Sequence, residues 1–310
     1  MSSPAVLCET QRHLAVVRWW DFLELTKPRI AVLVLLTVGV GSMVATGGMP
    51  EPWIVLHAVL GTALVAGSAS VLNQYLERHT DTLMPRTANR PLASGRMESR
   101  DALAFGLTLL VLGTAYLCCL VNGTTAIWGV VTWLLYVAVY TPLKSKTTLN
   151  TFIGAIPGAL PAIMGWTATG RPLNMEAGVL FLIVFLWQFP HFMAIAWLYR
   201  ADYAQAGLKM LPSVDPTGRL APMTAVLHSL VLLPVSLAPA ALAGPMAGPS
   251  YFAAAAVLGL AYFGFSLAFC IHTSTATARG LLKVSLVYLP SLLVFLVLDL
   301  TPTLIPLVSN

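Results

Sequence analysis

The sequence from residue 53 to residue 81 reads WIVLHAVLGTALVAGSASVLNQYLERHTD. Up to residue 76 it contains no Asp, Glu, Lys or Arg, whereas Glu77, Arg78 and Asp81 follow within the next turns. The hydrocarbon core of a bilayer is about 30 Å thick and is crossed by roughly 20 apolar residues of helix. Residues 53–76 are therefore predicted to form a transmembrane helix whose polar end reaches water.

The rest of the chain repeats this pattern. Hydrophobic residues make up 57% of the 310 positions and charged residues only 9%, whereas soluble domains carry about a quarter charged residues. We expect an all-α fold, a polytopic membrane bundle of about nine helices in one domain, residues 27–300. A count of eight stays open, because only Asn122-Gly123 separates the third span from the fourth. The other predicted spans are 28–48, 102–121, 124–141, 148–168, 177–199, 221–242, 251–272 and 282–300.

The basic residues predict the orientation. Cytoplasmic loops are enriched in Lys and Arg, and with nine spans every basic residue except Arg171 falls on the side of the amino terminus. We therefore expect the amino terminus inside, with residues 1–26 as a cytoplasmic segment and residues 301–310 as a short external tail. The two longest polar loops, 77–101 and 200–220, share the positive side, where the active face is expected.

Composition argues against several classes of protein. The net charge of +5 does not indicate a nucleic-acid partner, because the basic residues punctuate hydrophobic stretches and form no continuous patch.

The first 26 residues hold no signal-peptide cleavage pattern and no clear transit peptide, which favours a bacterial inner membrane over a mitochondrial one. The cysteines form no CxxC pair and lack metal-ligand spacing, so they are interpreted as small hydrophobes: Cys8, Cys118, Cys119 and Cys270.

The polar end of the quoted stretch predicts a metal–diphosphate site. Asn73, Glu77 and Asp81 are spaced i, i+4 and i+8, so a continued helix aligns them one turn apart on a single face. Mg²⁺ prefers oxygen ligands and typically takes one or two carboxylates together with substrate phosphates. The alternative is an ordinary solvated helix end.

Two arginines in the next loop favour the metal–diphosphate site over a solvated helix end. Arg86 and Arg90 lie four residues apart in Met84-Pro-Arg-Thr-Ala-Asn-Arg-Pro-Leu-Ala-Ser-Gly95, between prolines and a glycine. The guanidinium fork of arginine binds phosphate oxygens in a bidentate way. Topology anchors would supply the positive charge alone and would not need the neighbouring acids, so a site for a metal-bound diphosphate is favoured.

Together these stretches resemble a known family. Asn73-x3-Glu77-x3-Asp81, followed by Arg86-Thr-x2-Arg90-Pro-Leu, is similar to the first aspartate-rich motif of the UbiA-type membrane prenyltransferases. The resemblance is closer to the haem-farnesylating branch, it spans roughly residues 24–300, and several other strings carry it. They are Leu25-Thr-Lys27-Pro28-Arg29-Ile30, Tyr140-Thr-Pro-Leu-Lys144-Ser-Lys146, Trp187-Gln188-Phe189-Pro190-His191-Phe192, Asp202-Tyr203-x2-Ala206-Gly207-x2-Met210-Leu-Pro212 and Arg279-x3-Lys283-x-Ser285-x2-Tyr288.

The chain departs from the broad family pattern in one place. Ala206 stands where the second aspartate-rich motif of the superfamily has another acid, which puts the ligands of a second metal in doubt. Asp202, the acid that is present, could instead pair with Arg200 or Lys209 as a surface salt bridge. For His191, inside an apolar span, two roles stay open beside that of a satisfied core histidine: an axial contact to haem iron, or a hydrogen bond within the cavity.

The resemblance implies transfer of a farnesyl group from farnesyl diphosphate to a vinyl group of protohaem IX (haem b), with addition of water, giving haem O. Haem b would be a substrate and not a permanent cofactor, and Mg²⁺ would bind with the diphosphate. Haem A synthase and oxidase assembly proteins are candidate partners within the lipid bilayer. The alternatives are a UbiA-type enzyme that prenylates a quinone precursor or a chlorophyllide, and a non-enzymatic membrane transporter.

The site roles that the resemblance implies fall into three groups, and no residue is an obvious general base. The metal-binding and catalytic group is Asn73, Glu77, Asp81 and Asp202. The diphosphate-binding group is Arg86, Arg90, Lys144, Lys146, Arg200 and Lys209, although membrane anchoring alone would also explain the two lysines of the 144–146 stretch. The group lining the haem or substrate cavity is Tyr140, Trp166, Trp187, Gln188, His191 and Tyr203.

Overall fold

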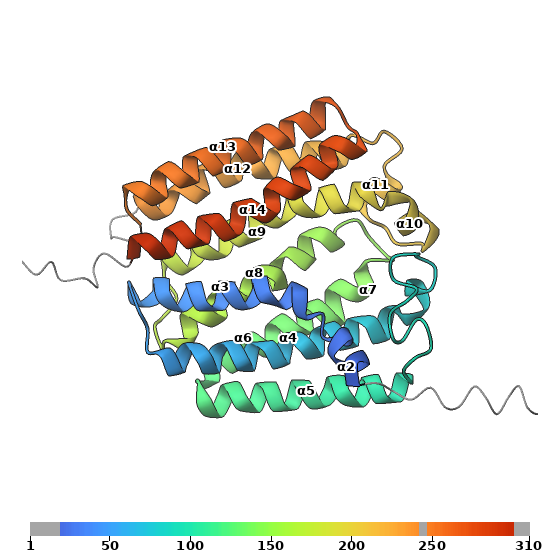
Figure 1. Ribbon diagram of the computed structural model, residues 1–310, viewed down its shortest axis with the longest axis horizontal. Helices are drawn as coiled ribbons and strands as arrows, with labels where there is room; N and C mark the ends of the chain where they lie inside the picture. The colour runs from blue at the N-terminus through green and yellow to red at the C-terminus, as the bar shows by residue number, and fades with distance from the viewer. Residues whose placement is uncertain (1–18, 242–246, 301–310) are drawn as a thin grey trace, which may run out of the picture.

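The computed structural model describes residues 19–241 and 247–300, and these residues form helices without any strand (Figure 1). Nine helices in this part of the chain are long and apolar enough to cross a membrane, which confirms the predicted fold class and count. They are α3 (Pro28–Thr46), α4 (Pro52–Asp81), α5 (Ser99–Leu120), the continuous run of α6, η2 and α7 (Gly123–Leu143), α8 (Asn150–Ala168), α9 (Met175–Leu198), α12 (Leu220–Ala241), α13 (Pro249–Ile271) and α14 (Thr275–Leu300).

The observed ends differ from the predicted ones where polar residues continue a helix. α4 has 30 residues, so it is about 45 Å long and extends beyond the hydrocarbon core with its polar last turns. α14 begins at Thr275, seven residues before the predicted start, because the long stems of Arg279 and Lys283 can pack on the helix while their charges reach water. The predicted external tail, residues 301–310, and most of the predicted amino-terminal segment lie outside the described residues.

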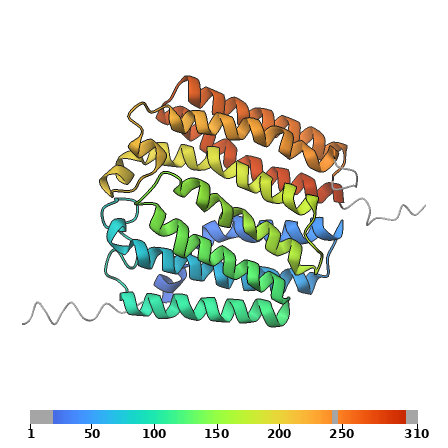
Figure 2. The same ribbon diagram turned by 180° about the vertical axis from the view of Figure 1, so that it is seen from behind.

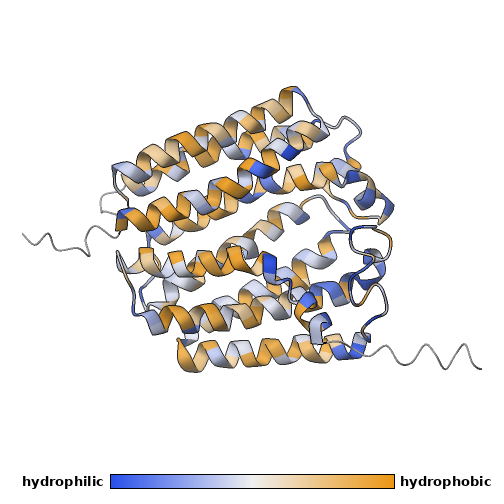
Figure 3. Cartoon of the chain, viewed as in Figure 1, coloured by the Kyte–Doolittle hydropathy of each residue, from blue (hydrophilic) through white to orange (hydrophobic). Residues whose placement is uncertain are grey.

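Both polar loops gather at one end of the bundle. Figures 1 and 2 show the helices side by side, with residues 82–98 next to α10 (Arg200–Gln205) and α11 (Leu211–Val214) at the same end. A short helix, α2 (Trp19–Leu25), lies against the bundle close to that end. Figure 3 shows hydrophilic residues concentrated there and hydrophobic residues along the middle of the helices. The apolar side chains that face outward, such as Val111 at 66% exposure, are suited to lipid.

Small residues bring α3 and α8 into close contact. A Cβ atom at Gly41 would collide with the carbonyl oxygen of Ala162, and one at Gly165 would collide with the backbone of Val38. The Ser42 hydroxyl donates a hydrogen bond of 2.8 Å to the Gly165 carbonyl. Small residues and interhelical hydrogen bonds are how membrane helices approach closely without a hydrophobic driving force. These contacts hold α8 in the centre of the bundle, where 72% of the residues in its most apolar 18-residue stretch are buried.

The fourth span contains a π-helical turn that the sequence did not predict. α6 (Gly123–Leu134) widens into η2 (Leu135–Tyr140) before α7 (Thr141–Leu143). The Thr141 hydroxyl donates a hydrogen bond of 2.9 Å to the Tyr136 carbonyl, which helps to satisfy the widened backbone. Such turns occur often at functional sites.

We expect Gly41→Ala to lower the unfolding temperature in detergent, because the added methyl group must displace the backbone of α8 at a cost of about 1–3 kcal/mol. Gly39→Ala is the matched control, since a Cβ there meets nothing within 4 Å. Thermal unfolding followed by tryptophan fluorescence measures both. Equal unfolding temperatures for the two variants would contradict the close contact between α3 and α8.

Candidate active site

A polar pocket lies at the carboxy-terminal end of α4, where the loop of residues 82–98 folds back. Its walls combine three residues of α4, here called the acidic stripe (Asn73, Glu77 and Asp81), with cations from three separate segments. Of the stripe, Asn73 and Asp81 are each 1% exposed and Glu77 is 9% exposed. The lining residues are Lys27, Asn73, Glu77, Asp81, Met84, Arg86, Thr87, Arg90, Tyr136, Tyr140, Lys144, Tyr203, Leu208 and Met210.

The buried Glu77 is paired with Lys144, which directly follows α7. The Lys144 ammonium donates a hydrogen bond of 2.7 Å to Glu77 Oε1. Burial alone would lower the pKa of Lys144, but the adjacent negative charge of Glu77 outweighs it and raises that pKa above its ordinary value. Lys144 is therefore a permanent cation of the pocket, and its aliphatic stem brings the ammonium 4.7 Å from the ring centroid of Tyr140.

Asp81 is held in the same way by the arginine that follows it in the loop. Arg90 Nη1 donates to both carboxylate oxygens, at 2.9 and 2.8 Å. The Thr87 hydroxyl donates a hydrogen bond of 2.8 Å to the Asp81 carbonyl, so the loop is fixed against the end of the helix at two points. Asp81 and Arg90 are only nine residues apart in the sequence, so a short loop is enough to pair them.

Lys27 is a pocket residue whose role the sequence did not predict. Its ammonium donates a hydrogen bond of 3.0 Å to Asn73 Oδ1. Burial, followed by the positive charges of Arg90 and Lys144, lowers the pKa of Lys27 to about 7. Among the described residues it is the one non-glycine with a positive φ, 52°, a conformation that costs of order 1 kcal/mol and often marks functional positions. The feature of the sequence that could have identified Lys27 as a pocket residue is its position directly before Pro28, at the start of the first span.

Arg86 also lines the pocket and is held by two tyrosines. Its Nη2 donates a hydrogen bond of 3.0 Å to the Tyr203 hydroxyl, and its guanidinium lies 4.3 Å from the ring centroid of Tyr199. Burial works against the charge, but Tyr203 and then Tyr199 and Asp202 outweigh it and raise the pKa of Arg86. Asp202 thus acts on Arg86 by its charge, while its own side chain does not line the pocket. Its predicted role as a metal ligand stays a prediction.

The other predicted phosphate contacts lie away from the pocket lining. Lys146, Arg200 and Lys209 are all exposed. Arg200 donates a hydrogen bond of 2.8 Å to the Trp197 carbonyl, and only the backbone of Lys209 reaches inward, donating one of 2.7 Å to the Lys144 carbonyl. In this arrangement none of the three predicted contacts is brought to the polar pocket.

A larger, mostly apolar cavity of about 340 Å³ adjoins the polar pocket. The two share four lining residues, Tyr136, Tyr140, Tyr203 and Met210. Among the predicted cavity residues, Trp187, Gln188 and His191 also line it. Trp166 does not line this cavity; it is buried elsewhere in α8 and donates a hydrogen bond of 3.0 Å to the Pro172 carbonyl.

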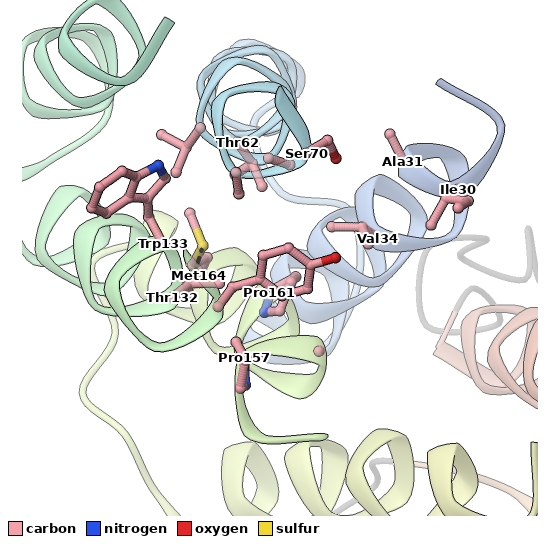
Figure 4. Close-up of a pocket in the computed structure, with 15 residues that line it drawn as sticks. Ile30, Ala31, Val34, Thr62, Ser70, Thr132, Trp133, Pro157, Pro161 and Met164 are labelled. Atoms are coloured by element: carbon pink, nitrogen blue, oxygen red, sulfur yellow. Dashed lines mark hydrogen bonds between the residues drawn. The ribbon is translucent and has the colours of Figure 1, made fainter. Parts of the chain in front are cut away.

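A third space, an apolar cavity of about 130 Å³, runs along α4 on the membrane side of the acidic stripe. It shares Tyr136 with both other pockets. Figure 4 shows Val34 of α3, Trp133 of α6 and Met164 of α8 around the same space, with Thr62 of α4 among them. Three compartments, one polar and two apolar, therefore meet at a single side chain.

This geometry agrees with the comparison to known proteins. A model of the UbiA prenyltransferase family matches residues 34–297. The chain belongs to this family. The resemblance inferred from the motifs is thereby confirmed.

Relatives and solved structures extend the comparison. The protein is 42% identical over 291 residues to protoheme IX farnesyltransferase of Solibacter usitatus, covering 90% of this chain and 98% of the relative. It is 41% identical over 283 residues to the protein of that name from Myxococcus xanthus, covering 91% and 95%. A digeranylgeranylglyceryl phosphate synthase has the same fold, with a TM-score of 0.76, 17% identity and coverage of 91% and 98%. A UbiA homologue of Archaeoglobus fulgidus, bound to DMAPP and Mg²⁺, gives a TM-score of 0.62 at 15% identity, covering 89% and 99%.

The donor atoms of this UbiA-family pocket fit a magnesium ion that arrives with a substrate. Within residues 19–241 and 247–300, no three His, Cys, Asp or Glu side chains form a ready-made cage. The acidic stripe instead offers two carboxylates and one amide oxygen, all buried in one pocket. Mg²⁺ usually completes its shell with water and phosphate oxygens, so such an incomplete set suits it.

The lowered pKa of Lys27 predicts that anion binding depends on pH. The free ammonium loses its proton near pH 7, whereas a bound diphosphate would retain that proton. The affinity for inorganic diphosphate is therefore expected to be highest below pH 7 and to fall above it, by up to about tenfold per pH unit.

Calorimetric titrations at several pH values measure this effect. Lys27→Arg keeps its charge at every pH tested and controls for the titration of diphosphate itself. The same pH slope for the wild type and Lys27→Arg would show that Lys27 does not contact the anion.

Proposed function

We propose that this protein transfers a farnesyl group from farnesyl diphosphate to a vinyl group of protohaem IX, with addition of water, giving haem O and diphosphate. The observation that carries the proposal is the meeting of one cationic pocket and two apolar cavities at Tyr136. Such an arrangement suits a reaction with an anionic leaving group, an isoprenoid chain and a large, mostly apolar acceptor. Relatives more than 40% identical over about 90% of the chain carry the corresponding name.

The polar pocket would bind the diphosphate. Arg86 and Arg90 present guanidinium groups, and Lys27 and Lys144 present amines, within one small lining. On binding, Arg90 and Lys144 would exchange their carboxylate partners for phosphate oxygens, which frees the carboxylates. Asn73, Glu77 and Asp81 would then hold Mg²⁺.

Mg²⁺, when bound, would neutralise negative charge on the diphosphate. The cationic side chains add to this effect because they are fixed in place before the reaction, in a site of low dielectric constant. They lower the free energy of the transition state, in which the bond between the farnesyl carbon and the diphosphate oxygen breaks and its electron pair leaves with the diphosphate.

The apolar cavity along α4 would receive the isoprenoid chain. From Asn73 to Thr62 the helix rises about 16 Å, a span suited to a chain of a few isoprene units. Ala66 and Ala69 line this stretch, so the side of α4 next to the chain is narrow. The cavity walls exclude water from the allylic cation.

The larger cavity would receive the acceptor. Tyr136 and Tyr140 line it as well as the polar pocket, and the faces of aromatic rings stabilise a neighbouring cation. The vinyl carbon forms the new bond to the farnesyl carbon. Water then adds to the resulting cation on the haem side and loses a proton, which balances the reaction.

The nine apolar spans within residues 19–241 and 247–300 make the chain an integral membrane protein. We infer in addition that the polar pocket faces the cytoplasm of a bacterial cell, because the pocket lies at the end of the bundle that carries the Lys- and Arg-rich loops. Haem A synthase and oxidase assembly proteins are the partners that would receive a haem O product.

The proposed reaction is tested by incubating the purified protein with haem b, farnesyl diphosphate and Mg²⁺. We expect a more hydrophobic pigment on reversed-phase chromatography, with the mass of haem b plus a farnesyl group and a hydroxyl group. An intact, folded preparation that yields no such pigment would overturn the proposal.

Asp81→Asn is expected to reduce turnover at least about a hundredfold. It removes the negative charge that would hold the metal and that now pairs with Arg90. Asp101→Asn is the matched control, because Asp101 lies at the start of α5, 40% exposed, and pairs with Arg100 on the surface. Equal turnover in both variants would remove Asp81 from the metal site.

Ala66→Phe is expected to shorten the isoprenoid chain that the enzyme accepts. The added ring would fill part of the cavity along α4, at a cost of about 1–3 kcal/mol for a long chain. Relative rates with farnesyl and geranyl diphosphate should then shift toward geranyl by about 10–100-fold. Ala63→Phe, on the same helix but not on this cavity, is the control. No change in the ratio would place the chain elsewhere.

A further inference from the structure

A buried hydrogen-bond chain fixes the imidazole of His191 at the wall of the larger cavity. His191 Nδ1 lies 2.8 Å from Ser285 Oγ, which joins α9 to α14. The same hydroxyl lies 2.6 Å from the Leu282 carbonyl oxygen. A carbonyl only accepts hydrogen bonds, so the single hydroxyl proton of Ser285 is directed at Leu282. Ser285 Oγ must then accept from His191, and the ring proton is on Nδ1.

The other ring nitrogen is consequently unprotonated. Within the described part of the chain Nε2 has no hydrogen-bond partner, and His191 lines the larger cavity. The ring is also held by stacking: its centroid lies 4.9 Å from that of Trp187, at an angle of 23°. The Trp187 Nε1–H donates a hydrogen bond of 2.8 Å to the Ser285 carbonyl. The Ser285 hydroxyl therefore fixes the His191 ring, and the Ser285 carbonyl fixes the Trp187 ring that stacks on it.

We propose that Ser285 is a positioning residue that presents the Nε2 lone pair of His191 to the iron of the haem acceptor. This inference rests on the proposed function and deepens it. Histidines that bind metals usually donate their other N–H to an oxygen acceptor, which fixes the tautomer and the ring orientation. The chain from Leu282 through Ser285 to His191 has this arrangement.

The group that accepts the hydrogen bond from His191, the Ser285 hydroxyl, also suits axial binding of a substrate haem and not of a resident cofactor. A carboxylate partner would strengthen the histidine as a donor to iron, whereas the Ser285 hydroxyl is neutral. Axial bonding of moderate strength would orient the acceptor and still allow the product to leave. The other groups on this cavity that could bind haem iron are the Met210 thioether and the phenol oxygens of three tyrosines, Tyr136, Tyr140 and Tyr203, whose spectra would differ from that of histidine ligation.

Ferric haem b titrated into the purified protein without farnesyl diphosphate tests the proposal. Absorption and electron paramagnetic resonance spectra report the axial ligand independently of catalysis. We expect a histidine-ligated spectrum for the wild type and for Met210→Leu, and its loss in His191→Ala. Ser285→Ala should weaken ferric haem binding about 10–100-fold and alter the spectrum, while Ser285→Thr, which keeps the hydroxyl, should restore both.

Two controls separate ligation from damage to the cavity. Ser266→Ala removes another fully buried serine, whose hydroxyl bonds only to its own helix at the Tyr262 carbonyl, and should leave the spectrum unchanged. Metal-free protoporphyrin IX lacks the iron, so the wild type, His191→Ala and Ser285→Ala should bind it equally well.

Several results would overturn the proposal. The wild-type spectrum in His191→Ala, or its loss in Met210→Leu, would remove His191 as the ligand. A Ser285→Ala variant that behaves like Ser266→Ala, or weakened binding of the metal-free porphyrin, would reduce Ser285 to a packing residue. If the wild type farnesylates haem in the product assay but any of these results is found, only this inference fails. A wild type that neither binds nor farnesylates haem overturns the proposed function as well.

Discussion

Two carboxylates at the carboxy-terminal end of α4, Glu77 and Asp81, are almost completely buried, and each has a cation within hydrogen-bonding distance. An unpaired buried charge costs several kcal/mol, so these partners are a condition of the fold. Lys144 comes from the end of the fourth span and Arg90 from the loop after α4. Pairing therefore folds the loop back on the helix and closes one end of the bundle around a polar pocket.

The same pairs make the pocket ready for an anion. Each acid of the stripe is paired with a cation, which in the proposed reaction would transfer to a phosphate oxygen. Lys27 differs from the other cations, because burial and its positive neighbours lower its pKa to about 7. An incoming diphosphate would reverse that shift, so substrate binding and protonation are coupled at this residue.

Two features of the backbone, the π-helical turn of η2 and the close contact between α3 and α8, separate the polar pocket from the larger apolar cavity. The π-helical turn of η2 places Tyr136 and Tyr140 on the border of the polar pocket and the larger cavity. Close packing at Gly41 and Gly165 keeps α8 against α3. A reactive cation would then form next to aromatic rings, with water held back by apolar walls.

By itself the sequence predicted the nine spans, the family and most of the polar pocket, because hydropathy and the i, i+4, i+8 spacing of Asn73, Glu77 and Asp81 are local properties. It could not show that Lys27 joins the pocket or that Trp166 stays outside the cavity, since both depend on how distant helices pack. The tautomer of His191 likewise depends on Ser285, 94 residues away. Hydrogen bonds between helices form only when the tertiary structure brings their donors and acceptors together, and surroundings of low dielectric constant then make a buried polar group without a partner costly.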